Sequence, residues 1–212
     1  MKNNQSGFTL VEIAIVLVII GLLLGGVLKG QELINSAKVK NLANDFRTIP
    51  TMVFAYQDKF RALPGDDRAA SAHVAGVPLA TNGNGDGRID GAWNAPTPCA
   101  TESCNFWQHV RLANLASGST DPANPDYIPR NSEGGPIGIT GLDPSNNNWA
   151  GNFFVCSTGI QGRFVRQLDI TSDDGNTTTG SIRVIALAAG GAVAANLTPA
   201  DDANLYTVCS SN

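Results

Sequence analysis

The sequence predicts an α+β protein in which a long N-terminal helix packs against an antiparallel sheet in a loop-rich globular head. Three observations support this fold class. An apolar stretch covers residues 8–28, an apolar stripe at helical spacing continues along residues 42–60, and runs of β-branched and aromatic residues come late in the chain. The 23 glycines and 11 prolines indicate long loops between these elements.

The first of these features, residues 8–28, contains a single charged side chain, Glu12. As a helix, this stretch would rise roughly 32 Å, about the thickness of the hydrocarbon core of a bilayer. It is longer than the apolar core of a signal peptide, and no small-residue cleavage pattern follows it. We therefore expect a membrane-spanning helix. A carboxylate inside such a helix costs about 2.5 to 3.5 kcal/mol on insertion scales, so Glu12 needs a cationic partner.

The motif GFTLVE at residues 7–12, preceded by a short polar leader, resembles the processing site of type IV prepilins and of the related pseudopilins of type II secretion. In that family a membrane peptidase cuts after the glycine and methylates the new terminal phenylalanine. The resemblance implies processing at Gly7 and Phe8, a leader of residues 1–7, a stem helix of residues 8–63 with its transmembrane part at 8–28, and a globular, pilin-like head of residues 64–212.

Physical chemistry gives the pairing of Phe8 with Glu12 a reason. Cleavage would create an ammonium group on Phe8, and a carboxylate four residues later lies one helical turn away on the same face. In a growing filament, Glu12 of one subunit could instead neutralise the Phe8 amine of its neighbour. The alternative is an ordinary signal-anchor helix in which Glu12 has no special role.

Beyond the apolar stretch, the stem continues as an amphipathic helix. Apolar side chains recur at steps of three or four residues, which places them on one face: Leu42, Phe46, Ile49, Val53, Tyr56 and Phe60. That face is where the head should pack. The helix is expected to stop at the sequence LPGD, residues 63–66.

Residues 82–93 resemble the first part of an EF-hand calcium loop, with a glycine at the sixth position and an apolar residue at the eighth. The expected metal ligands are Asn82, Asn84, Asp86, the carbonyl of Arg88, and Asp90. Trp93 stands where a bidentate glutamate belongs, so Asp66, Asp67 or Glu102 would have to complete the shell. We expect weak calcium binding, with a Kd of about 10⁻⁴ to 10⁻³ M. The alternative is a glycine- and asparagine-rich turn without metal. No other cofactor is expected.

The remaining elements are assigned from local patterns. Amphipathic spacing predicts a helix at residues 105–115, and residues 117–151 are interpreted as long loops. Strands are expected at residues 152–156, 181–187 and 205–209, a short helix at 162–169 and a turn at 173–176. The paired acids Asp66-Asp67, Asp173-Asp174 and Asp201-Asp202 are interpreted as turn residues.

The chain has four cysteines, which beyond a membrane anchor indicate an oxidising compartment. Three pairings can be drawn, and we favour Cys99 with Cys104 and Cys156 with Cys209. Closing the longer loop would restrict the unfolded chain by roughly 4 kcal/mol. Zinc binding is the alternative, although no C-x-x-C spacing is present.

The sequence does not favour an enzyme. His73 and His109 are far apart, and the chain contains no nucleophile-elbow, zinc-protease or phosphate-loop motif. His109 is interpreted as a partly exposed packing residue. The formal net charge of −4 does not favour nucleic acid as a partner.

Three functions are therefore considered. The first is a structural subunit of a type IV pilus-like filament, polymerised through its N-terminal helix. The second is a type II secretion pseudopilin or a minor tip pilin with a binding role, in which Arg163, Arg166 and Arg183 could form a basic patch. The third is a membrane-anchored, calcium-dependent binding domain that does not polymerise.

The resemblance also implies partners and a location. The partners are other pilin subunits in a homo- or hetero-polymer, the prepilin peptidase/methyltransferase and the inner-membrane assembly platform. We expect a single-pass protein of the inner membrane with its head in the periplasm, and later a periplasmic or extracellular filament.

Overall fold

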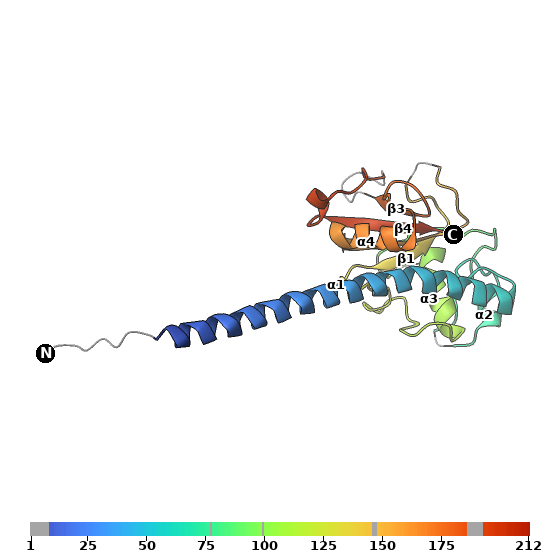
Figure 1. Cartoon of the computed structure of the whole chain (residues 1–212). Coiled ribbons are helices and arrows are strands. Elements are labelled where there is room, and N and C mark those ends of the chain that lie inside the picture. The colour runs from blue at the N-terminus through green and yellow to red at the C-terminus, as the bar shows by residue number, and fades with distance from the viewer. Residues whose placement is uncertain (1–8, 77, 99, 146–147, 186–192) are drawn as a thin grey trace. The chain divides into compact units, whose positions relative to one another are not determined.

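The computed structural model describes residues 9–76, 78–98, 100–145, 148–185 and 193–212 (Figure 1). Its helices are α1 (Leu10–Phe60), α2 (Ala70–His73), α3 (Glu102–Leu112), α4 (Gly162–Ser172) and the 3₁₀ helix η1 (Pro199–Asp201). Its strands are β1 (Ile137–Thr140), β2 (Phe154–Gln161), β3 (Ile182–Ile185) and β4 (Leu205–Ser211). The predicted α+β class, a long N-terminal helix with an antiparallel sheet, is confirmed.

Helix α1 runs through 51 residues and includes Pro50. The contacts of the chain divide it into two units, with the boundary inside this helix between Ala37 and Lys38. Within the second unit the predicted stripe is buried from Leu42 to Tyr56, while Phe60 is half-buried. From Leu42 to Val53 the stripe enters one hydrophobic core with residues of α3, α4 and the strands, while Tyr56 and Phe60 belong to a second cluster that includes Ala70 of α2. The stem therefore forms one wall of the head.

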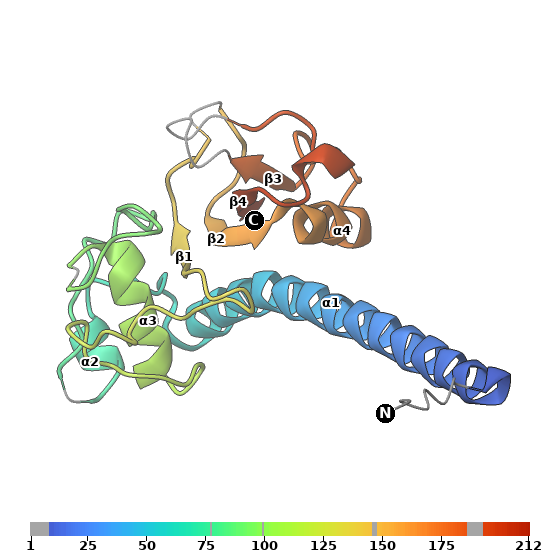
Figure 2. The ribbon, with the colours of Figure 1, turned by 90° about the vertical axis from the view of Figure 1, so that its left-hand side faces the viewer.

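The sheet has the strand order β1-β2-β4-β3, and every neighbouring pair is antiparallel (Figure 2). Cys156 on β2 lies opposite Cys209 on β4 in the register of the two central strands. The three predicted strands are all present, and β2 is longer than expected because it continues to Gln161. The C-terminal strand β4 thus lies in the interior of the sheet, with a neighbour on each side.

The prediction that residues 117–151 form only loops was wrong at strand β1. This strand has four residues, lies between Pro136 and Gly141 and contains Gly138, so it lacks a clear alternating pattern. A side chain at Gly138 would collide with the carbonyl oxygen of Trp93. A tertiary contact with a distant loop, which local pattern cannot reveal, explains why glycine occupies this strand.

Helix α3 begins three residues earlier than predicted, at Glu102, and ends at Leu112. Every residue from Glu102 to Arg111 is buried, including the polar side chains of Gln108 and His109. Such burial requires internal hydrogen-bond partners for the polar groups. These partners lie in the loops that follow α1 and α3, and they organise the most polar part of the head.

Candidate functional site

The first unit contains the predicted membrane helix. Helix α1 is long and apolar enough to cross a membrane, and none of the side chains in its most apolar window is buried. It is therefore distinct from a core helix of a soluble protein, whose apolar face would be covered. Gly7 and Phe8 lie outside the described residues, so their predicted roles in processing stay predictions.

Glu12 takes part in an N-terminal cap that sequence reasoning missed. Its Oε2 accepts hydrogen bonds from the backbone N–H of Thr9 and from the Thr9 hydroxyl, each at 2.8 Å. In return, the Glu12 N–H donates to Thr9 Oγ1 at 3.3 Å. This reciprocal arrangement is a capping box, and the T-x-x-E spacing was its visible signal. The carboxylate is thereby directed toward the start of the helix.

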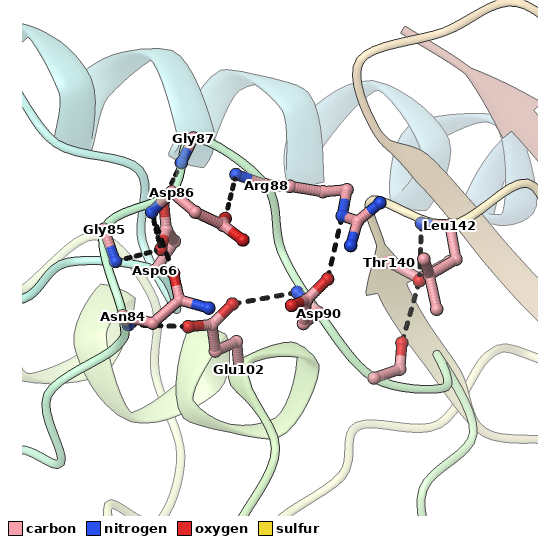
Figure 3. A network of polar contacts seen from close by, with 11 residues as sticks. Asp66, Asn84, Gly85, Asp86, Gly87, Arg88, Asp90, Glu102, Thr140 and Leu142 are labelled. Carbon is pink, nitrogen blue, oxygen red and sulfur yellow. Dashed lines mark hydrogen bonds and ion pairs between the residues drawn. The ribbon is translucent and has the colours of Figure 1, made fainter.

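In the head, the loop of residues 82–90 surrounds the buried carboxylate of Asp66 (Figure 3). Asp66 Oδ1 accepts from the N–H groups of Gly85 at 2.6 Å and Asp86 at 3.1 Å, and Oδ2 accepts from that of Gly87 at 2.8 Å. Gly85 and Gly87 have positive φ values, which only glycine adopts without strain. The glycines therefore let the loop direct its N–H groups at one carboxylate.

Glu102, at the start of α3, holds the same loop from the other side. Its Oε1 accepts from the N–H of Asn84 at 2.7 Å and its Oε2 from that of Asp90 at 2.9 Å. Beyond the loop, the N–H of Gly141 donates to the carbonyl of Ile89 at 2.7 Å. The segment is thus fixed between the end of the stem, α3 and the end of β1.

The four predicted calcium ligands that offer side-chain oxygens accept hydrogen bonds within this part of the head. Asn82 Oδ1 accepts from the N–H of Ser71, Asn84 Oδ1 from that of Asp86, and Asp86 Oδ1 from that of Arg88. Asp90 Oδ1 accepts from the Arg88 guanidinium at 2.8 Å. The bonds from Asn84 to Asp86 and from Asp86 to Arg88 are Asx turns, which are the bonds expected of a glycine- and asparagine-rich turn without metal.

One predicted ligand, Asp86, does come together with two of the residues named as completing the shell, Asp66 and Glu102. One carboxylate oxygen each from Asp66, Asp86 and Glu102 lies within 4.8 Å of the others. An all-oxygen group of this kind suits a hard cation such as calcium. The same oxygens of Asp66 and Glu102 already accept backbone N–H bonds, although a carboxylate oxygen has a second lone pair. Calcium binding by this loop stays a prediction.

Asp67 anchors a second buried network next to the first. Its Oδ2 accepts from the Tyr56 hydroxyl at 2.8 Å and lies 2.6 Å from His73 Nδ1, and its Oδ1 accepts from the N–H of Ala69. Burial alone would raise the pKa of Asp67, but the hydrogen bonds from His73, Ala69 and Tyr56 lower it overall. The interpretation of Asp66 and Asp67 as turn residues was incomplete, because both carboxylates are buried anchors.

His109 is fully buried, so the prediction of a partly exposed residue was wrong. Its Nδ1 accepts from the N–H of Gly65 at 2.8 Å, and Nε2 lies 2.7 Å from the carbonyl of Thr81. A backbone amide can only donate, so Nδ1 is unprotonated and Nε2 carries the hydrogen. The neutral ring therefore joins the end of the stem to the start of the polar loop.

This geometry predicts a pH dependence of stability. Burial lowers the pKa of His109 from 6.5, against opposing effects of the Thr81 carbonyl and Asp67. Below pH 6.5 the unfolded chain binds a proton that the folded chain does not, so the free energy of unfolding decreases as pH falls, by up to about 1.4 kcal/mol per unit. Urea unfolding at several pH values should show this decline. The H109Q variant should have a shallower slope between pH 6.5 and 5, and an unchanged slope would contradict the assignment.

The disulfide between Cys156 and Cys209 is present and joins the two central strands of the sheet, with a sequence separation of 53. This confirms one of the two favoured pairings. Cys99 lies outside the described residues, so its pairing with Cys104 stays a prediction.

The three arginines considered for a basic patch have separate partners. Arg166 forms an ion pair with Asp202 at 2.7 Å, Arg163 lies over the ring of Phe164, and Arg183 lies over that of Trp149. Each arginine therefore has a structural contact within the head.

Comparison with known families bears on the N-terminus alone. A family model described as the prokaryotic N-terminal methylation motif matches residues 2–28. Neither the curated proteins nor the solved structures that were compared with the chain gave a match. The matched segment contains the leader, the Gly7-Phe8 junction and Glu12. The chain therefore carries, over residues 2–28, the class III signal sequence that characterises precursors of type IV pilins and pseudopilins.

Proposed function

We propose that this protein is a structural subunit of a type IV pilus-like filament, cleaved after Gly7 and polymerised through its N-terminal helix. The observation that supports this most is the position of Glu12 within the methylation motif. It is the one charged residue in an otherwise apolar stretch at residues 8–28. Such a carboxylate is costly in a bilayer unless a cation meets it.

The capping box supports the pairing of Glu12 with a new N-terminus. Glu12 Oε2 accepts from the Thr9 nitrogen, which follows Phe8 directly in the chain. Cleavage after Gly7 would place a positive charge on the adjoining residue, within reach of the same carboxylate or of Glu12 on a neighbouring subunit. The pairing lowers the cost of a charge at membrane depth, and the apolar stems can pack against each other around it.

The motif implies processing by a prepilin peptidase and assembly with other pilin subunits, and it fits anchoring in the inner membrane through the N-terminal helix. We further propose that the head faces the periplasm before assembly. The disulfide between Cys156 and Cys209 supports this location, because such bonds persist in oxidising compartments.

Shearing of surface filaments from intact cells tests the proposal directly. A pilus subunit should be recovered in the sheared fraction, identified by peptides of the head. A pseudopilin should remain with the cells, and deletion of its gene should impair protein secretion. Retention in the membrane together with normal secretion would contradict both forms of the proposal and favour an anchored binding domain.

Calcium binding by the loop of residues 82–90 is a separate proposal, supported by the three carboxylate oxygens of Asp66, Asp86 and Glu102. Millimolar calcium should raise the melting temperature of the chain, and D86A should reduce this rise. Asp86 is exposed, so its loss should not unfold the head. An identical rise in the wild type and in D86A would contradict this site.

A further inference from the structure

The carboxyl group of Asp169, near the C-terminal end of helix α4, is buried without a hydrogen-bond partner. The residue has 0% of its surface exposed, and neither Oδ1 nor Oδ2 has a partner among the described residues. Buried polar groups are almost always satisfied, and a buried charge without compensation is strongly unfavourable. A group in this position needs something that the protein itself does not provide.

Two further carboxylates lie beside it. Asp173 ends helix α4 and Asp174 follows it, and one oxygen from each lies within 4.8 Å of an oxygen of Asp169 and of the other. The three differ in exposure: Asp169 is buried, Asp173 half-buried and Asp174 exposed. The cluster therefore extends from the interior of the head to its surface, which gives an ion a path to the buried oxygen.

Asp173 and Asp174 are held in place by the residues that lead to β3. Asp173 Oδ2 accepts from the N–H of Ile182 at 2.8 Å, and Asp174 Oδ2 accepts from the Thr179 hydroxyl at 2.7 Å. Asp174 Oδ1 accepts from the N–H of Asn176, also at 2.8 Å. These bonds fix the two carboxylates beside Asp169 in spite of the repulsion between like charges.

The electrostatics of the cluster favour a cation. Burial raises the pKa of Asp169 to about 6, and the charges of Asp173 and Asp174 add to this effect. The nearby backbone of Gly175 opposes it more weakly and makes no hydrogen bond to the carboxylate. The C-terminal end of a helix also carries a partial negative charge. Hydrogen bonds from Thr179 and Asn176 lower the pKa of Asp174, and the charge of Arg183, whose guanidinium lies over the Trp149 ring, lowers it slightly further. At neutral pH the site thus concentrates negative charge around an unsatisfied oxygen pair.

We propose that Asp169, Asp173 and Asp174 form a binding site for a divalent cation, for which calcium is the best candidate. All three side chains offer oxygen, which hard cations prefer. Ligands on opposite sides of a calcium ion are about 4.6 to 5.2 Å apart, so the observed separations fit a shared ion. The ion would join the end of α4 to the segment that leads into β3. This site is separate from the loop of residues 82–90 and does not depend on the proposed assembly function.

Equilibrium dialysis and thermal unfolding of the full-length chain in detergent, with calcium as the probe, test this site. The wild type should bind calcium, and millimolar calcium should raise its melting temperature by about 3 to 6 °C, as expected for roughly tenfold saturation of a site in a domain of this size. D169N should lose one bound ion per chain. Its melting temperature without calcium should not fall, because the substitution removes an uncompensated buried charge.

Two further variants make the outcome unambiguous. D174N changes an exposed ligand, so it cannot disturb the core, and it should weaken calcium binding at this site at least about tenfold. D86N serves as the matched control in the other acidic loop and should leave the ion held by Asp169 in place. The proposal is overturned if the wild type binds no calcium at millimolar concentration, or if D169N and D174N both bind as much calcium as the wild type.

Discussion

Replacing Glu12 with alanine is expected to abolish incorporation of the protein into filaments while leaving its insertion into the membrane intact. The substitution removes the only carboxylate in an apolar stretch, so insertion becomes easier, by about 2.5 to 3.5 kcal/mol on insertion scales. The amine of a processed neighbour would then enter the packed stems without a partner. Membrane fractionation and recovery from sheared filaments measure the two effects independently.

The capping box requires a second variant, because E12A removes both the charge and the cap on the Thr9 N–H. Glutamine at this position can still cap the helix but carries no charge. E12Q should therefore fail to assemble as E12A does. The matched control is E32A, which removes an exposed glutamate that pairs with Lys29 farther along the same helix. Normal assembly of E12Q would show that capping, and not charge pairing, explains the residue.

Loss of the disulfide between strands β2 and β4 is expected to reduce the free energy of unfolding by about 4 kcal/mol. The bridge closes a loop with a sequence separation of 53, and the estimate follows from the entropy that it removes from the unfolded chain. For a domain with a total stability of about 5 to 15 kcal/mol, this is a large fraction.

The double variant C156A/C209A isolates this effect, because it leaves no unpaired thiol from the bridge and does not touch the other two cysteines. Urea unfolding under oxidising conditions should show the full decrease relative to the wild type. A difference below about 1 kcal/mol would mean that the register of β2 and β4, and not the covalent link, holds the C-terminal strand in place.

The elements with a clear pattern of apolar residues could be predicted from the sequence. The stripe from Leu42 to Phe60 follows from helical spacing, and three of the four strands follow from β-branched and aromatic runs. Strand β1 could not be predicted, because Gly138 is explained only by the carbonyl of Trp93 that approaches it. Local pattern has no access to a contact between segments this far apart in the sequence.

The polar sites were harder to predict than the fold. The sequence singled out the glycine-rich loop of residues 82–90 and named Asp66 and Glu102 as residues that could join it. It could not show that their carboxylates accept the backbone N–H groups that shape the loop, because they come from separate segments. The unsatisfied state of Asp169 was also invisible, because acids near a turn look alike whether they are solvated or buried. Only the N-terminal cap left a signal that could have been found, the T-x-x-E spacing of Thr9 and Glu12.

The central claim is that Glu12 meets an amine that exists only after cleavage, and mass spectrometry of the mature N-terminus tests it most directly. The protein should be isolated from sheared filaments or, for a pseudopilin, from membranes of cells with an active assembly system. We predict that the mature chain begins at Phe8 and carries a methyl group on its α-amine. A chain that retains residues 1–7 in these fractions would contradict the account, because Glu12 would then have no such partner.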